Sequence, residues 1–203
     1  MPQPISDVAP DANIAFANVG DRPLARHPDL ALLAMEAIES WSNVENFMLN
    51  FFLELFGGNR TLAANVYLSL DGWNAKSSAI RAAANSVLDE NSNRLLNAIL
   101  AVFKTNQKSR DKLAHWTWGD SPQVPDGLLL ANPKAQITDT DKDQIYVYRE
   151  QDFKNIIEAN NRLCGYAQLF QFILMGHIAN ANNELFDQLC REPEIQERLS
   201  RPV

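Results

Sequence analysis

The chain is poor in the residues that build disulfide frameworks and metal clusters. Only 2 of its 203 residues are cysteines and only 3 are histidines. Cys164 and Cys190 stand 26 residues apart, outside any CxxC motif or His/Cys cluster. Such isolated cysteines are typical of buried free thiols in a reducing compartment. We therefore expect no metal, no cofactor and a cytoplasmic location.

A basic excess is also missing. The chain has 18 Lys+Arg against 25 Asp+Glu, which gives a formal net charge of -7 at pH 7. Proteins that coat long nucleic acids usually carry a strong positive charge. We therefore expect no DNA partner, and we expect any contact with RNA at a small local site.

Long apolar runs are absent as well. The two most apolar runs, 47–56 and 169–179, are broken by polar residues. Both are shorter than the ~18 to 20 residues that a membrane span needs. The first residues show no basic segment followed by an apolar core, so they do not read as a secretory signal. These absences predict a protein without a membrane partner.

What the sequence does contain is helical periodicity. In 29–56, apolar residues recur at spacings of three and four, and two glycines follow. This pattern predicts a long helix whose second half is apolar around most of its circumference. Because a small bundle does not easily cover such a helix, we expect a partner surface and a homodimer. Similar patterns predict further helices at 62–70, 72–90, 93–116 and 153–192.

The helical pattern fails between 117 and 149, where turn-forming residues are frequent and a small hairpin is the most regular structure expected. Five of the ten prolines fall in 1–28, which reads as an irregular N-terminal arm. Segment 193–203 reads as a polar tail. The fold class that we expect is all-α: a single domain over 29–192, built as a bundle of four to five helices with a short irregular or β-hairpin insertion around 117–149.

A candidate catalytic site stands at the end of the fourth predicted helix, in "RDKLAH". Arg110 follows the inward-facing Phe103 by seven residues, so its charge needs an anionic partner or a wet cleft. Asp111 and His115 are four residues apart and share a helix face, where a carboxylate can fix the tautomer of an imidazole. Together these side chains can bind a phosphodiester and move a proton. The alternative is an ordinary helix end whose cations suit the helix dipole.

These six residues resemble the signature of the HEPN superfamily, which is Arg, then Asn, Asp or His, then three further residues and a His. The continuation "LAHW" is similar to that of small prokaryotic members, and "WSNVENFMLNFFLELFG" resembles their first long helix. The resemblance covers roughly residues 30 to 190, and the six-residue motif is its most specific part. It implies a HEPN-like helical bundle.

The resemblance also implies a function. Many HEPN proteins are metal-independent ribonucleases that act as homodimers, with two motifs facing each other across a composite cleft. In that scheme Arg110 binds phosphate and stabilises the transition state, Asp111 orients the site, and His115 is the general base or acid. The 2′-hydroxyl of the RNA attacks the adjacent phosphate and leaves a cyclic phosphate.

The resemblance further implies a toxin or a defence or stress effector, with an antitoxin or nucleotidyltransferase as partner. Thr117 departs from this pattern, because toxins that such a transferase modifies carry Tyr at that position. The alternative function is a non-catalytic helical HEPN-like module that binds a nucleotide, an RNA or a protein partner.

Four further residues complete the expected site. Lys108 and Lys112 concentrate positive charge for a substrate, and Trp116 can stack on a base or, alternatively, seal the end of the bundle. Glu45 lies one turn after Trp41 and can reach Arg110, or else it is an ordinary exposed glutamate.

Overall fold

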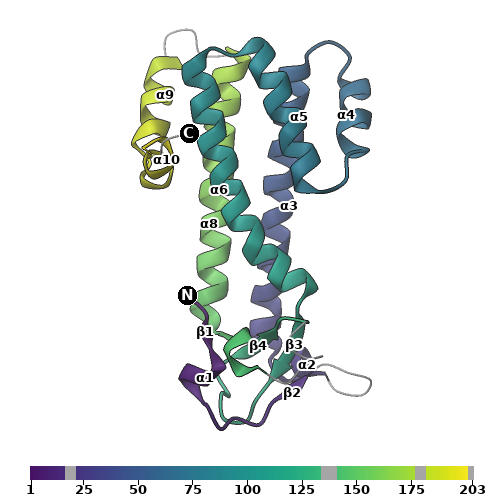
Figure 1. Ribbon diagram of the computed structural model, residues 1–203, viewed down its shortest axis with the longest axis vertical. Coiled ribbons are helices and arrows are strands. Elements are labelled where there is room, and N and C mark those ends of the chain that lie inside the picture. The colour runs from purple at the N-terminus through teal and green to yellow at the C-terminus, as the bar shows by residue number, and fades with distance from the viewer. Residues whose placement is uncertain (17–21, 134–140, 177–181, 201–203) are drawn as a thin grey trace. The chain divides into compact units, whose positions relative to one another are not determined.

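The computed structural model describes residues 1–16, 22–133, 141–176 and 182–200. Nine α-helices and five short strands lie among these described residues (Figure 1). The chain divides into two compact units. The first comprises Met1–Trp41 and Asn106–Asn160, and the second comprises Ser42–Thr105 and Asn161–Val203.

Three long helices contribute residues to both units: α3 (Pro28–Phe56), α6 (Glu90–His115) and α8 (Glu150–Met175). Helix α3 ends where Gly57 and Gly58 adopt φ values of 66° and 64°. This left-handed conformation has a low cost for glycine and stops the helix. Helix α3 therefore begins one residue before its predicted start and ends where predicted.

The first unit is built around an antiparallel sheet with the strand order β1-β5-β4-β3-β2. The central strands are β3 (Thr117–Asp120), β4 (Leu128–Ala131) and β5 (Ile145–Tyr148). The outer strands, β1 (Gln3–Pro4) and β2 (Ala15–Phe16), both come from the first 16 residues. The first 16 residues thus pair with both edges of the three central strands, through β1 on β5 and β2 on β3.

Apolar side chains cover both faces of this sheet. One face packs with the N-terminal segment, through Leu129, Val147 and Ile5. The other face packs against the helices, through Leu130, Tyr148 and Phe153. All four residues of β4 are buried for this reason. The strand consequently shows no alternation of apolar and polar residues, which is the usual signal of a half-exposed strand.

The second unit is helical in its described residues. It adds α4 (Arg60–Leu68), α5 (Gly72–Val87), α9 (Asn182–Arg191) and α10 (Pro193–Leu199) to the remaining parts of the long helices. Asn59 caps the start of α4, because its side chain accepts a hydrogen bond from the Leu62 amide.

Aromatic pairs connect the helices of this unit. Phe51 meets Phe170 edge-on with ring centroids 5.5 Å apart, and Phe52 lies 5.3 Å from the Tyr67 ring. The apolar second half of α3 is therefore largely covered by helices of its own chain. Our reason for expecting a partner surface there no longer holds, because this surface is mostly buried without one.

The all-α prediction was wrong. The fold is a mixed α/β arrangement with a five-stranded antiparallel sheet, and it has more helices than a bundle of four to five. Segment 1–28, expected as an irregular arm, holds β1, β2 and two short helices, α1 (Ile5–Val8) and α2 (Pro23–Arg26). The insertion at 117–149 contains the expected hairpin pair, β4 with β5, and adds a further strand, β3, that pairs with β4. The 3-10 turn η1 (Lys142–Gln144) precedes β5, and residues 134–140 lie outside the described part.

Two further boundaries differ from the expectation. The helix predicted over 153–192 is divided, because α8 ends at Met175 and Gly176 follows with a φ of 62°. The polar tail at 193–203 contains α10, whose Ile195 is fully buried.

Candidate functional site

The "RDKLAH" motif occupies the last turns of α6 in the first unit. The helix ends at His115, where the Trp116 amide donates to the Lys112 carbonyl at 2.9 Å, and β3 begins two residues later. Lys112 and His115 lie in the last turn, where the helix dipole favours positive charge.

Arg110 is held in place on one side only. Its side chain is 30% exposed, and Nη1 donates to Asp111 Oδ1 at 3.2 Å. Its Nε is buried and has no hydrogen-bond partner in the described part of the chain. Because Nε is buried, the donors that an anion can reach are the remaining ones on the two terminal nitrogens.

Asp111 and His115 are not brought together as we expected. The Asp111 carboxylate contacts the Arg110 guanidinium, and no hydrogen bond joins it to His115 among the described residues. The His115 side chain is exposed. Its imidazole is accessible for proton transfer, but its tautomer is not fixed by the neighbouring carboxylate.

Lys112 lies between two aromatic rings. Its Nζ is 4.9 Å from the centroid of Trp116 and 4.5 Å from that of Tyr146, at cation–π distances. The two rings are themselves 5.9 Å apart. Burial lowers the pKa of Lys112. Trp116 is thus a partner of Lys112, while Lys108 on the same helix is exposed.

Glu45 belongs to the second unit. It is exposed, and its charge adds to burial in raising the pKa of Tyr67. The contact that we expected between Glu45 and Arg110 stays a prediction.

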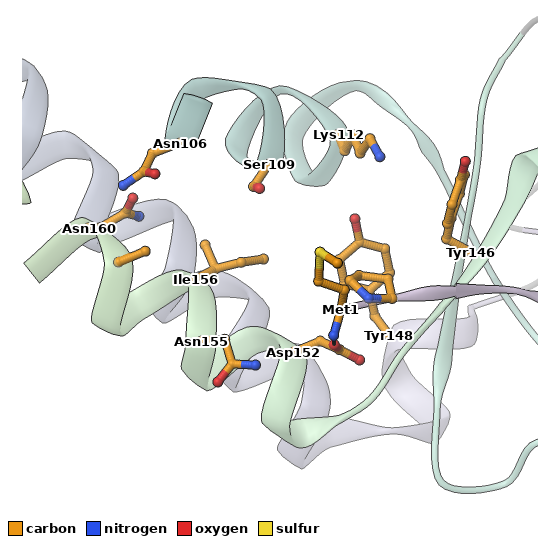
Figure 2. Close-up of a pocket in the computed structure, with 12 residues that line it drawn as sticks. Met1, Asn106, Ser109, Lys112, Tyr146, Tyr148, Asp152, Asn155, Ile156 and Asn160 are labelled. Atoms are coloured by element: carbon orange, nitrogen blue, oxygen red, sulfur yellow. Dashed lines mark ion pairs between the residues drawn. The ribbon is translucent and has the colours of Figure 1, made fainter. Parts of the chain in front are cut away.

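A cavity of about 400 Å³ in the first unit was not predicted from the sequence. Figure 2 shows it between α6, α8 and β5, with Asn106, Ser109 and Lys112 on the α6 side. These three residues recur at a spacing of three, so they share a helix face. This spacing is the only feature of the sequence from which the α6 side of the cavity was predictable.

Two buried polar atoms in the cavity wall have no hydrogen-bond partner in the described part of the chain. They are Asn106 Nδ2 and Asn160 Oδ1. The Asn160 amide is only 1% exposed, and its Nδ2 donates to Ser40 Oγ at 2.9 Å and towards the Ala37 carbonyl at 3.4 Å. Because the Ala37 carbonyl can only accept, its contact with Nδ2 fixes the orientation of the Asn160 amide. The amide oxygen, Oδ1, is left unpaired among the described residues.

A second cluster that the sequence did not predict joins the end of α2 to β3. Arg26 donates to both carboxylate oxygens of Asp120, with Nη2 to Oδ1 at 2.6 Å, and His27 Nε2 lies 3.5 Å from Oδ2. Asp120 is buried, and the Arg26 hydrogen bonds are the main reason that its pKa is lowered. No sequence signal links His27 and Asp120, because 93 residues separate them.

Metal-binding and membrane-spanning features are both missing from the described residues. They contain no group of three or more His, Cys, Asp or Glu side chains placed to hold a metal ion. No described helix combines the length and the apolar character that crossing a bilayer requires.

Comparison with protein-family models, with curated proteins and with solved structures found no match. The resemblance of "RDKLAH" to the HEPN signature therefore stays a prediction based on the motif.

Proposed function

We propose that the chain is a metal-independent ribonuclease of the HEPN type, acting at the C-terminal end of α6. The observation that carries this proposal is the state of Arg110. The guanidinium is 30% exposed and makes one contact, from Nη1 to Asp111, so the other donors of its terminal nitrogens are suited to two oxygens of a phosphodiester. Asp111 restrains this guanidinium from one side, so less side-chain freedom is lost when phosphate binds.

His115 supplies the proton transfer in this proposal. As an exposed imidazole at the same helix end, it accepts the proton of the 2′-hydroxyl, or donates one to the leaving oxygen. The 2′-oxygen attacks phosphorus, the bond to the 5′-oxygen breaks, and a 2′,3′-cyclic phosphate and a 5′-hydroxyl result.

The proposed enzyme is a homodimer in which two α6 ends face each other. A single copy does not pair His115 with Asp111, so an orienting group for the imidazole has to come from elsewhere, and a second copy supplies one. A toxin or defence effector is the biological role that we infer for such an enzyme, with an antitoxin as its inhibitory partner.

The test is cleavage of a fluorescent single-stranded RNA in buffer with EDTA. Wild type should cleave, and Arg110→Ala and His115→Ala should each be at least about 100-fold slower, because each removes a group that acts on the reacting phosphate. Arg60→Ala is the matched control, because Arg60 is also paired with a carboxylate, Glu54, but lies in the second unit. Circular dichroism establishes that all variants fold.

If the folded wild-type protein leaves RNA intact, the proposed ribonuclease activity is excluded. The non-catalytic binding module would then be the better account of the motif.

A further inference from the structure

The cavity of the first unit has two chemically different ends (Figure 2). Asn106 and Asn160 form one end, where α6 and α8 face each other. Lys112 and the tyrosines of β5 form the other end. Its volume of about 400 Å³ lies within the usual range of small-molecule sites, about 300–1,000 Å³.

The amide end presents one unpaired donor and one unpaired acceptor. Asn106 Nδ2 and Asn160 Oδ1 are both buried without a partner among the described residues. Buried polar groups nearly always have partners, so a molecule in the cavity that supplies an acceptor to Asn106 and a donor to Asn160 gains two hydrogen bonds. A group with a neighbouring acceptor and donor, such as a lactam or a carboxamide, satisfies both atoms.

The opposite end presents a cation without a counter-ion. Lys112 lies over two aromatic rings, and the described residues include no carboxylate within ion-pair distance of it. The carboxylate that does line the cavity is already engaged: Asp152 contacts the Met1 amino group at 3.3 Å and accepts from the Arg149 amide at 3.1 Å. One available cation beside one carboxylate fits a ligand with a single negative charge better than a polyanion.

The distance between the ends limits the size of the ligand. Asn106 and Lys112 are six residues apart on one helix, which corresponds to a rise of about 9 Å. A single six-membered ring that bears a carboxylate spans this distance with a hydrogen bond at each end. Ile156 and Ala159 add apolar surface along the α8 side, suited to the face of a flat ring.

A second hollow, in the second unit, does not share these features. Its polar lining includes Asp89 and Ser92, which are already bonded to each other, with Ser92 Oγ donating to Asp89 Oδ2 at 2.8 Å. It therefore presents no comparable unpaired atoms in the described part of its wall.

We propose that the cavity of the first unit binds a small planar heterocyclic carboxylate, with its lactam edge on Asn106 and Asn160 and its carboxylate on Lys112. The cavity shares Lys112 with the substrate-binding residues expected from the motif, but Arg110, Asp111 and His115 do not line it, so this proposal does not rest on the ribonuclease proposal.

The test is isothermal titration of the full chain with three probes. Orotate carries both the lactam edge and the carboxylate, uracil carries only the edge, and benzoate carries only the carboxylate. Orotate should bind at least about tenfold more tightly than either of the others, since one further hydrogen bond to a charged or buried group is worth about that much. Lys112→Gln should reduce orotate binding to that of uracil, and Asn106→Ala should reduce it to that of benzoate.

Lys76→Gln is the matched control, because Lys76 also lies over a tyrosine, Tyr67, at 5.3 Å but is outside the cavity. It should leave the orotate affinity unchanged, and thermal melting checks that each variant folds. Absence of orotate binding at millimolar concentration, or equal binding by wild type, Lys112→Gln and Asn106→Ala, overturns the proposal. Arg110→Ala should bind orotate like wild type, so this test and the RNA assay fail independently.

Discussion

The contact between Arg110 and Asp111 changes what single substitutions in the motif should do. The sequence alone predicts that Asp111 orients His115, so that its loss would affect the imidazole. In the structure the carboxylate restrains the guanidinium instead. Substitutions at Asp111 should therefore act through phosphate binding rather than through proton transfer.

Asp111→Ala should lower kcat/KM for RNA cleavage by about 10- to 100-fold, since a hydrogen bond to a charged group contributes about 1.5–3 kcal/mol. Asp111→Asn should have a smaller effect, because an amide oxygen still accepts from Arg110. The pH profile of kcat/KM should keep its midpoints in both variants. A displaced midpoint would assign the carboxylate to His115 and contradict its role as a restraint on Arg110.

Arg110→Lys should not restore activity. An ammonium provides a point charge with the same sign, but it does not provide the planar fork that binds two phosphate oxygens together. We expect its kcat/KM to stay within about tenfold of Arg110→Ala. Recovery to near the wild-type rate would show that charge alone is required at this position.

Asp120 should make the free energy of unfolding depend on pH in the acid range. Arg26 lowers the folded-state pKa of this carboxyl below its ordinary value of 3.8. Its contribution to the free energy of unfolding is therefore complete above about pH 3.8, and it is lost as the pH falls through the lower folded-state value. Asp120→Asn should destabilise by about 1–2 kcal/mol at pH 7, less than a fully buried pair, because Arg26 is nearly half exposed.

Urea denaturation at pH 7 and pH 3 checks this expectation. The difference between wild type and Asp120→Asn should shrink at the lower pH. Asp126→Asn removes an exposed ion pair with Arg149 and is the control, with an expected change below about 0.5 kcal/mol. A difference that stays constant with pH would exclude the Arg26 contact as its source.

At the scale of elements, the long helices were predictable, whereas of the strands only a hairpin within 117–149 was. The stripe of α3 follows from Ala37, Val44 and Met48, which recur along one face and are fully buried. The strands lack an equivalent signal, because β1 and β2 have two residues each and β4 is buried on both faces. The positions of β1 and β2 depend on pairings between residues more than about 100 positions apart, such as Gln3 with Val147.

In the candidate site, too, residues that are close in sequence were predictable, and residues that only the fold brings together were not. The motif residues and Lys112 were predictable because they are neighbours in the sequence. Asn160 and Tyr148 were not, because only the fold brings them to α6. Arg26 and His27 were missed for the same reason, since their partner Asp120 lies on a strand that periodicity did not reveal.

The end of α8 gives a prediction for an element boundary. Gly176 has a φ of 62°, and a Cβ there would meet nothing within 4 Å, so Gly176→Ala should lose about 1–2 kcal/mol through backbone conformation alone. Gly165, inside the same helix, is equally open. Gly165→Ala should gain about 0.5–1 kcal/mol. Urea denaturation of the two variants should therefore move in opposite directions, and a shift in the same direction would contradict the assigned helix end.

At the scale of the whole molecule, a net charge of -7 would limit how strongly the proposed ribonuclease binds RNA. If Arg110 and Lys108 of two copies contact phosphate, about four contacts form. The slope of log K against log salt for single-stranded RNA is then about -3, at about -0.7 for each contact. Fluorescence anisotropy should give this value, and Arg110→Ala should make it shallower by about 1.4. A slope near about -7 would indicate a larger basic surface than the motif provides.

Assembly is the second prediction at this scale. Light scattering at micromolar concentration should give twice the mass of 22.8 kDa if two motifs form one cleft. His115→Ala should keep this mass, so loss of activity in that variant would not be caused by dissociation. A monomer in solution would exclude the composite cleft. The proposal for the cavity of the first unit would be unaffected, because one copy of the chain forms that cavity.

The pairing of the first 16 residues with both sides of the sheet has a consequence for the handling of the protein. Segment 1–16 supplies the outer strands β1 and β2, which occupy the hydrogen-bonding groups of β5 and β3. Trimming this proline-rich segment as if it were a dispensable leader would leave two open strand edges on the same sheet. Open edges join to those of other molecules, so the shortened chain should precipitate during expression although every residue of the motif is intact.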